Sequence, residues 1–156
     1  MSPVIRIPWE NRLTKMIQQP GGMKVVDALQ RAADNLDSIR GECVAALDQR
    51  LDEIVRLHVQ GGQKPEPAVE DAIYQMANEI HGVAGVFGMA ELGEAAFSLC
   101  DLVDRLRALG RWSSAAIEVH IAALRLFREP EVVGDRAQVL QGLRKVTDRY
   151  AAATQT

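Results

Sequence analysis

The stretch VEDAIYQMANEIHGVAGVFG, residues 69–88, repeats apolar side chains at steps of three or four positions. This spacing is typical of an amphipathic α-helix, in which residues three and four apart share one face. We expect the helix to begin near Ala68, with Glu70 and Asp71 favourably placed in its first turn, and to end at Gly88. The side chains predicted to be buried are Val69, Ile73, Met76, Ile80, Val83 and Phe87.

Helical periodicity continues on both sides of this stretch. Before it, the pattern over 24–58 predicts either one long helix or two helices stacked end to end. After it, three more helices are predicted, at about 91–109, 115–127 and 136–152. Amphipathic helices that are joined by short loops pack as an antiparallel bundle.

We therefore predict an all-α fold, an antiparallel four-helix bundle with an irregular N-terminal arm and a long first helix. The predicted domains are the arm at 1–23, the helical bundle at 24–152 and a polar tail at 153–156. Aromatic residues make up only 4% of the 156 residues, and this composition favours helices packed on helices over sheets.

Composition also limits the function. The net charge of -3 argues against nucleic acid as the main partner. No apolar run approaches the roughly 18 residues that span a bilayer, and no signal peptide is visible, so we expect a cytoplasmic protein without a membrane partner. Because no nucleophilic triad, phosphate loop or metal-ligand spacing is present, we expect no enzymatic turnover, no cofactor and no metal site.

The predicted helix at 69–88 also has a distinctive outward face. Advancing about 100° per residue from Met76, the residues that fall opposite the buried side are Tyr74, Asn78, His81 and Gly85, with Gly82 nearby. A glycine in a helix interior costs roughly 1 kcal/mol relative to alanine. Glycines on an exposed strip therefore indicate that another backbone approaches closely, although fraying near the helix end would also explain Gly85.

The segment NEIHGVAGVFGM, residues 78–89, resembles the phosphorylation-site helix of histidine phosphotransfer (HPt) domains. In that family the motif runs His-x-x-Lys-Gly, then five residues, then Gly. Aligning Phe87-Gly88 places Gly82 on the first glycine of the motif, His81 on the lysine and Asn78 on the phosphoryl-accepting histidine.

The resemblance covers nearly the whole chain. The spacing from Phe87-Gly88 to Ser98-Leu99-Cys100 is similar to that of a bacterial HPt subgroup. The segments at 120–126 and 7–13 are also similar to parts of that subgroup. The resemblance implies a four-helix HPt-type bundle that acts in two-component phosphorelay signalling. Its partner would be a response-regulator receiver domain or a sensor histidine kinase.

The residue at the phosphoacceptor position changes the expected chemistry. An HPt histidine needs an exposed, nucleophilic imidazole at neutral pH, whereas the amide nitrogen of Asn78 has no available lone pair. The chain has no Lys or Arg between Lys64 and Arg105, so the stretch around Asn78 is acidic. This favours a pseudo-HPt, which keeps a docking face but accepts no phosphate.

Two other hypotheses stay open. In the first, His81 accepts the phosphoryl group in place of Asn78. It lies one turn along the helix and about 60° around it from Asn78, so a partner would have to dock in a shifted position. Alternatively, the chain is a structural or dimerisation bundle without a phosphorelay partner. The candidate binding residues are Tyr74, Gly82 and Gly85, with Glu79 and Gly88 at the edge of the face.

Overall fold

The computed structural model describes residues 21–129 and 135–151. Within these ranges every regular element is a helix, so the all-α prediction is confirmed. Residues 1–20 of the predicted arm, and the predicted tail at 153–156, lie outside the described residues.

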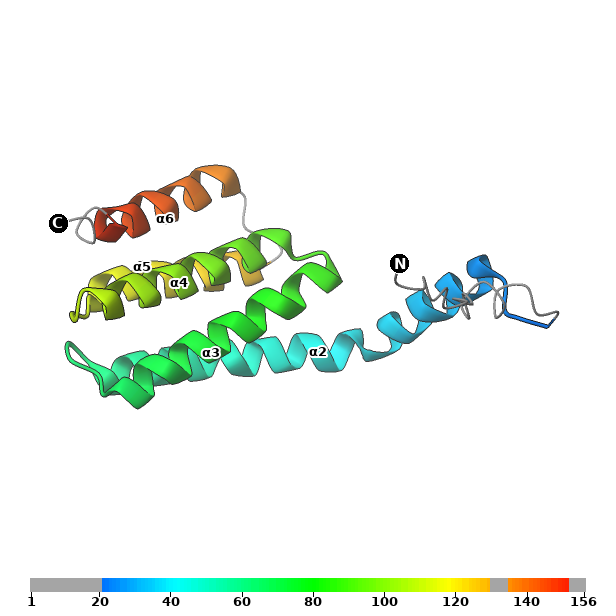
Figure 1. Cartoon of the computed structure of the whole chain (residues 1–156), viewed down its shortest axis with the longest axis horizontal. Helices are drawn as coiled ribbons and strands as arrows, with labels where there is room; N and C mark the ends of the chain where they lie inside the picture. Colours follow the sequence, from blue (N-terminus) through cyan, green and yellow to red (C-terminus); the bar gives the residue numbers. More distant parts are fainter. Residues whose placement is uncertain (1–20, 130–134, 152–156) are drawn as a thin grey trace, which may run out of the picture. The chain divides into compact units, whose positions relative to one another are not determined.

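The helices lie close to their predicted positions in the sequence. They are α2 (Val25–Gly61), α3 (Pro67–Ala84), the 3₁₀ turn η1 (Gly85–Phe87), α4 (Ala90–Ala108), α5 (Ser114–Arg128) and α6 (Arg136–Ala151) (Figure 1). Of the two possibilities for the N-terminal pattern, the structure has the single long helix, α2, of 37 residues.

The described residues fall into two compact units. The first contains residues 21–39, which include the N-terminal part of α2. The second contains 40–129 and 135–151, and both the hydrophobic core and α3 belong to it. The predicted boundary between arm and bundle, after residue 23, stays a prediction.

α4 is the central helix of the second unit. It packs against α3, α5 and α6, and Figure 1 shows it between α3 and α6. Because α4 has neighbours on several sides, 10 of its 19 residues are buried, which is more than a single apolar stripe supplies. Its fully buried residues are Ala95, Ala96, Leu99, Leu102, Val103 and Leu106.

Glycine determines how α3 ends. The helix tightens into η1 at Gly85, and Gly88 has the left-handed φ of 77°. The N–H of Gly88 donates to the carbonyl of Gly85 at 3.4 Å, and the N–H of Met89 donates to that of Ala84 at 2.9 Å. These bonds close the helix terminus, and the left-handed conformation favours glycine, so the predicted stop at Gly88 is confirmed.

The buried face of α3 differs from the predicted one. Its buried residues are Ile73, Ala77, Ile80 and Ala84, whereas Val69, Met76 and Val83 are only half-buried. On a helical wheel the centre of the face lies about 70° from Met76, on the side of Ala77. The predicted buried face was centred on Met76, a large apolar side chain. Packing on α4 instead buries small alanines, which allow the two helices to approach closely.

Candidate functional site

The surface of α3 around Asn78 is open to solvent. The predicted site residues that are exposed are Asn78, Glu79, His81, Gly82, Gly85 and Gly88, and Tyr74 is half-buried. Asn78, Glu79, Gly82 and Gly85 lie about 110–170° from the centre of the buried face, and we call these four residues the α3 face.

Gly82 lies inside α3 although nothing in the described chain requires a glycine there. A Cβ added at Gly82 would meet no heavy atom within 4 Å, and the same holds at Gly85. Gly85 begins η1, where the helix is already changing, but Gly82 lies within a regular turn of α3. The cost of glycine in the interior of a helix therefore has no compensation in packing within the described residues.

Asn78 presents a carboxamide on this face. Among the described residues its side chain makes no hydrogen bond or ion pair. A carboxamide offers one acceptor oxygen and two N–H donors, but its nitrogen lone pair is delocalised. Asn78 is therefore suited to hydrogen bonding with a partner, and it lacks the nucleophile that phosphoryl transfer requires.

His81 is also exposed, but its ring lies against α4. Its Nδ1 is 3.0 Å from the carbonyl oxygen of Gly93, and its ring centroid is 5.4 Å from that of Phe97. His81 is thus exposed, as expected, but its ring is turned toward α4 and away from Asn78. The reason is the shift in the buried face, which brings His81 to within about 70° of its centre. Since a carbonyl only accepts, Nδ1 carries the hydrogen, and the neutral ring has its lone pair on Nε2.

Tyr74 contacts α4 through both its ring and its backbone. The guanidinium of Arg107 lies 5.4 Å from the centroid of the Tyr74 ring, and the thiol of Cys100 donates to the Tyr74 carbonyl at 3.7 Å. The half-buried ring is thus committed to packing within the chain. Tyr74 lies one helical turn before Asn78 on α3, as the helical wheel predicted, but its ring contacts Arg107 of α4.

Arginines from other helices pair with the acidic residues around α3. Arg50 of α2 contacts Glu79 at 2.5 Å, Arg107 of α4 contacts Asp71 at 2.6 Å, and Arg144 of α6 contacts Glu94 at 3.0 Å. The stretch around Asn78 is acidic in sequence, as predicted, but arginines from elsewhere in the chain partly neutralise it. Exposed pairs of this kind contribute little to stability, but they reduce the local negative potential.

An apolar groove borders the α3 face where α2 packs against α3. The groove has a volume of about 330 Å³ and is lined by Cys43, Ala46, Leu47, Arg50, Glu79, Gly82 and Val83. Sequence reasoning missed Arg50, because it precedes Glu79 by 29 residues and only the packing of α2 brings the two together. Apolar walls with one ion pair at the rim are typical of a surface that binds a protein.

A second hollow, of about 250 Å³, lies on the other side of His81, between α3, α4 and α6. Its lining includes one cation, Arg144, and the carboxylates of Glu94, Asp101 and Asp148. Arg144 is paired with Glu94. The hollow therefore offers a positively charged group near His81, but in a setting with more acidic than basic groups.

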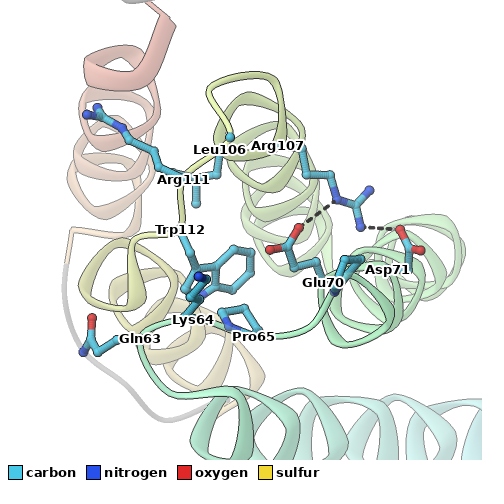
Figure 2. Close-up of a pocket in the computed structure, with 11 residues that line it drawn as sticks. Gln63, Lys64, Pro65, Glu70, Asp71, Leu106, Arg107, Arg111 and Trp112 are labelled. Atoms are coloured by element: carbon cyan, nitrogen blue, oxygen red, sulfur yellow. Dashed lines mark hydrogen bonds and ion pairs between the residues drawn. The ribbon is translucent and has the colours of Figure 1, made fainter.

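A third pocket, of about 720 Å³, lies at the other end of α3, near its N-terminus (Figure 2). Figure 2 shows Glu70 and Asp71 reaching toward Arg107, with Trp112 and Pro65 on the facing wall. Arg107 lies 3.7 Å from Glu70 and 2.6 Å from Asp71. Arg107 thus contacts both carboxylates, and the pocket contains no residue of the α3 face.

A buried polar cluster connects α4, α5 and α6. His120 is fully buried, with Nδ1 2.9 Å from the carbonyl of Ala116 and Nε2 3.0 Å from Oγ of Ser98. Thr147 is 3.3 Å from Ser98 and donates to the carbonyl of Leu143 at 3.1 Å. Burial lowers the pKa of His120 from the usual 6.5, and this effect outweighs the hydrogen bond to Ala116 and the charge of Asp101. His120 is thus a neutral structural residue.

This lowered pKa predicts a loss of stability in mild acid. Between the lowered pKa and 6.5 the unfolded chain binds a proton that the folded chain does not, so the free energy of unfolding falls as the pH drops through 6.5. The slope from this group is at most about 1.4 kcal/mol per pH unit. Urea denaturation at several pH values should show this slope in the wild type and in His81→Gln. The slope should be reduced in His120→Gln, and an unchanged slope there would contradict the assignment.

No protein-family model, curated protein or solved structure matches the chain.

Among the described residues no group of three or more His, Cys, Asp or Glu side chains is placed to hold a metal ion. In the same part of the chain, no helix combines the length and apolar character needed to cross a membrane.

Proposed function

We propose that this protein is a pseudo-HPt, which binds a response-regulator receiver domain through the α3 face and accepts no phosphate. The observation that carries the proposal is the exposed Asn78 at the position of the family's histidine, beside an interior glycine that packing within the described chain does not require. The arrangement that we propose is an antiparallel four-helix HPt-type bundle with an N-terminal arm and a long first helix.

The chemistry of the face supports binding without transfer. Asn78 provides a donor and an acceptor for a partner, but no nucleophile. The family's lysine, which neutralises the charge of the phosphoryl group, is replaced by His81, whose ring contacts Gly93 and Phe97. Arg50, on the other side, is paired with Glu79. The residues around Asn78 thus supply hydrogen-bonding groups and small side chains, and they do not form a site that accepts a phosphoryl group.

The shape of the surface supports a protein partner. Gly82 and Gly85 leave room for the backbone of a partner, and the groove between α2 and α3 has mainly apolar walls. Val86, which is 56% exposed, adds apolar area next to Gly85. A receiver domain is the partner that the family resemblance implies, and a sensor histidine kinase is the other candidate of that class.

Docking is testable with a matched pair of glycine variants. Gly82→Arg places a long, positively charged side chain on the α3 face, where it blocks the approach of a partner. We therefore expect the affinity for a receiver domain to fall at least about tenfold. Gly142→Arg is the control, because Gly142 is also an exposed helical glycine whose added Cβ would meet nothing within 4 Å. Titration calorimetry against receiver domains from the same genome measures both. Equal binding by the two variants, or no binding by the wild type to any receiver or kinase, would contradict the proposal.

A second function, phosphotransfer through His81, has one observation in its favour. The contact of Nδ1 with the Gly93 carbonyl leaves the lone pair on Nε2, which is the arrangement that a nucleophilic imidazole needs. Arg144 in the adjoining hollow would supply a cation, but Glu94 holds it and Asp101 and Asp148 lie beside it. We rank this function below the pseudo-HPt. A structural bundle without a phosphorelay partner is distinguished from both by receiver binding.

A further inference from the structure

The pocket of about 720 Å³ at the N-terminal end of α3 has the size of a site for a small molecule. Such sites have volumes of roughly 300–1,000 Å³, with apolar walls and a few polar groups that orient the ligand. Trp112 and Pro65 form one wall of this pocket, and Glu70 and Asp71 reach toward Arg107 across from them (Figure 2). Among the described residues that line the pocket, Trp112 is the only aromatic one, so its indole is the surface on which a flat ring would stack.

The side chain of Trp112 is not fully engaged by packing within the protein. It is half-buried, and among the described residues its indole N–H donates to no acceptor. The one buried side-chain nitrogen without a partner in that part of the chain is Nδ1 of His58, so the indole N–H of Trp112 is open to solvent. A buried tryptophan N–H usually has a hydrogen-bond partner. Trp112 thus offers an incoming molecule both a ring to stack on and a hydrogen-bond donor.

The charge of the lining that has no counterion is positive. The charged residues of the lining sum to +1, from three cations and two anions, and they are Lys64, Glu70, Asp71, Arg107 and Arg111. Arg107 lies 3.7 Å from Glu70 and 2.6 Å from Asp71, so both carboxylates already have a cation. Lys64 and Arg111 form no ion pair with a described residue, and the guanidinium of Arg111 lies 5.5 Å from the ring centroid of Tyr150. The pocket therefore attracts an anion more readily than a cation.

We propose that this pocket binds a small flat molecule that carries an anionic group, with its ring on Trp112 and its anion on Lys64. Lys64 is exposed and lies in the loop between α2 and α3, where its flexible stem lets the ammonium follow the ligand. An ammonium that donates to an anion forms a stronger hydrogen bond than a neutral pair forms. The carboxylates of Glu70 and Asp71 repel an anion on the opposite wall, and this favours the orientation with the anion on Lys64.

This site is independent of the proposed receiver docking, because its lining contains none of the four residues of the α3 face. Either can fail without the other.

Two probes that differ in charge test the site. Naphthylacetate is a flat ring with a carboxylate, and naphthylacetamide has the same ring without the charge. In the full chain with Trp9→Phe, Trp112 is the one remaining tryptophan of two, so its indole N–H gives a single signal in a proton–nitrogen NMR spectrum. We expect this signal to shift on titration with naphthylacetate, with a Kd of about 1 mM or lower, and naphthylacetamide to bind about fivefold more weakly.

Lys64→Gln removes the cation that holds the carboxylate, and we expect its Kd for naphthylacetate to rise about fivefold. Lys145→Gln is the matched control, because Lys145 is an exposed lysine of α6 that does not line the pocket. Both variants should keep the helical circular dichroism of the wild type, since both side chains are exposed.

Three results would overturn the proposed site. The first is an indole signal of Trp112 that does not shift with naphthylacetate up to about 10 mM. The second is an affinity for naphthylacetate no higher than that for naphthylacetamide. The third is a Lys64→Gln variant that binds naphthylacetate as tightly as Lys145→Gln does.

Discussion

The double variant Asn78→His with His81→Lys is expected to accept a phosphoryl group from phosphoramidate and pass it to a receiver domain. The substitution at Asn78 places an imidazole on the exposed α3 face, where its nitrogens are open to a small phosphodonor. The lysine adds, one turn further along, the cation that the family has at this position. It also removes the His81 ring from its contact with the Gly93 carbonyl. Both ingredients of the relay are then present at the position that the family motif uses.

Intact mass and phosphorus NMR measure the phosphohistidine, and loss of the signal on addition of a receiver measures transfer. Gln141→His is the control, since Gln141 is an exposed residue of α6 and a lone histidine there should pass no phosphate to a receiver. If the double variant is phosphorylated but inert toward every receiver tested, the docking part of the account fails. If it is not phosphorylated at all, the alignment that places Asn78 on the family's histidine fails.

Phe127→Ala is expected to lower the free energy of unfolding by about 3–5 kcal/mol, because it removes a buried aromatic ring and leaves a cavity. Phe127 of α5 is 5% exposed and belongs to the hydrophobic core. Phe97→Ala makes the same substitution at a ring that is 59% exposed on α4, and there we expect a loss below about 1 kcal/mol.

Urea denaturation followed by circular dichroism at neutral pH measures both variants. Because both substitutions are Phe→Ala, the difference between their losses of free energy reports mainly the burial of the two rings. Similar losses for Phe97→Ala and Phe127→Ala would contradict the packing of α5 into the core. Phe97 also contacts His81, so the free energy of that ring contact is included in the small expected loss.

Local signals predicted the helices and their ends well. Apolar spacing indicated each helix, and Gly88 indicated the end of the helical segment formed by α3 and η1, because left-handed backbone favours glycine. The one continuous α2 agrees with the unbroken spacing of its apolar residues. These features depend on residues within one or two turns of each other, and such residues are adjacent in the sequence.

The orientation of α3 and the charges around it were not predictable in the same way. The buried face is centred near Ala77 because α4 approaches closely there, and the sequence of α3 alone does not report where α4 lies. Arg50 and Arg144 reach the acidic residues of α3 and α4 from helices that are distant in sequence. The direction of His81 depends on the carbonyl of Gly93, 12 residues away across a turn.

The central claim is that the α3 face binds but does not accept phosphate, and its most direct test is chemical phosphorylation of the wild-type chain. Phosphoramidate is the donor, intact mass and phosphorus NMR are the readouts, and His81→Ala runs beside the wild type. We predict no phosphohistidine that passes phosphate to a receiver, because Asn78 has no nucleophile and His81 lies against α4. A wild-type phosphohistidine that transfers to a receiver and disappears in His81→Ala would contradict the account and assign the relay to His81.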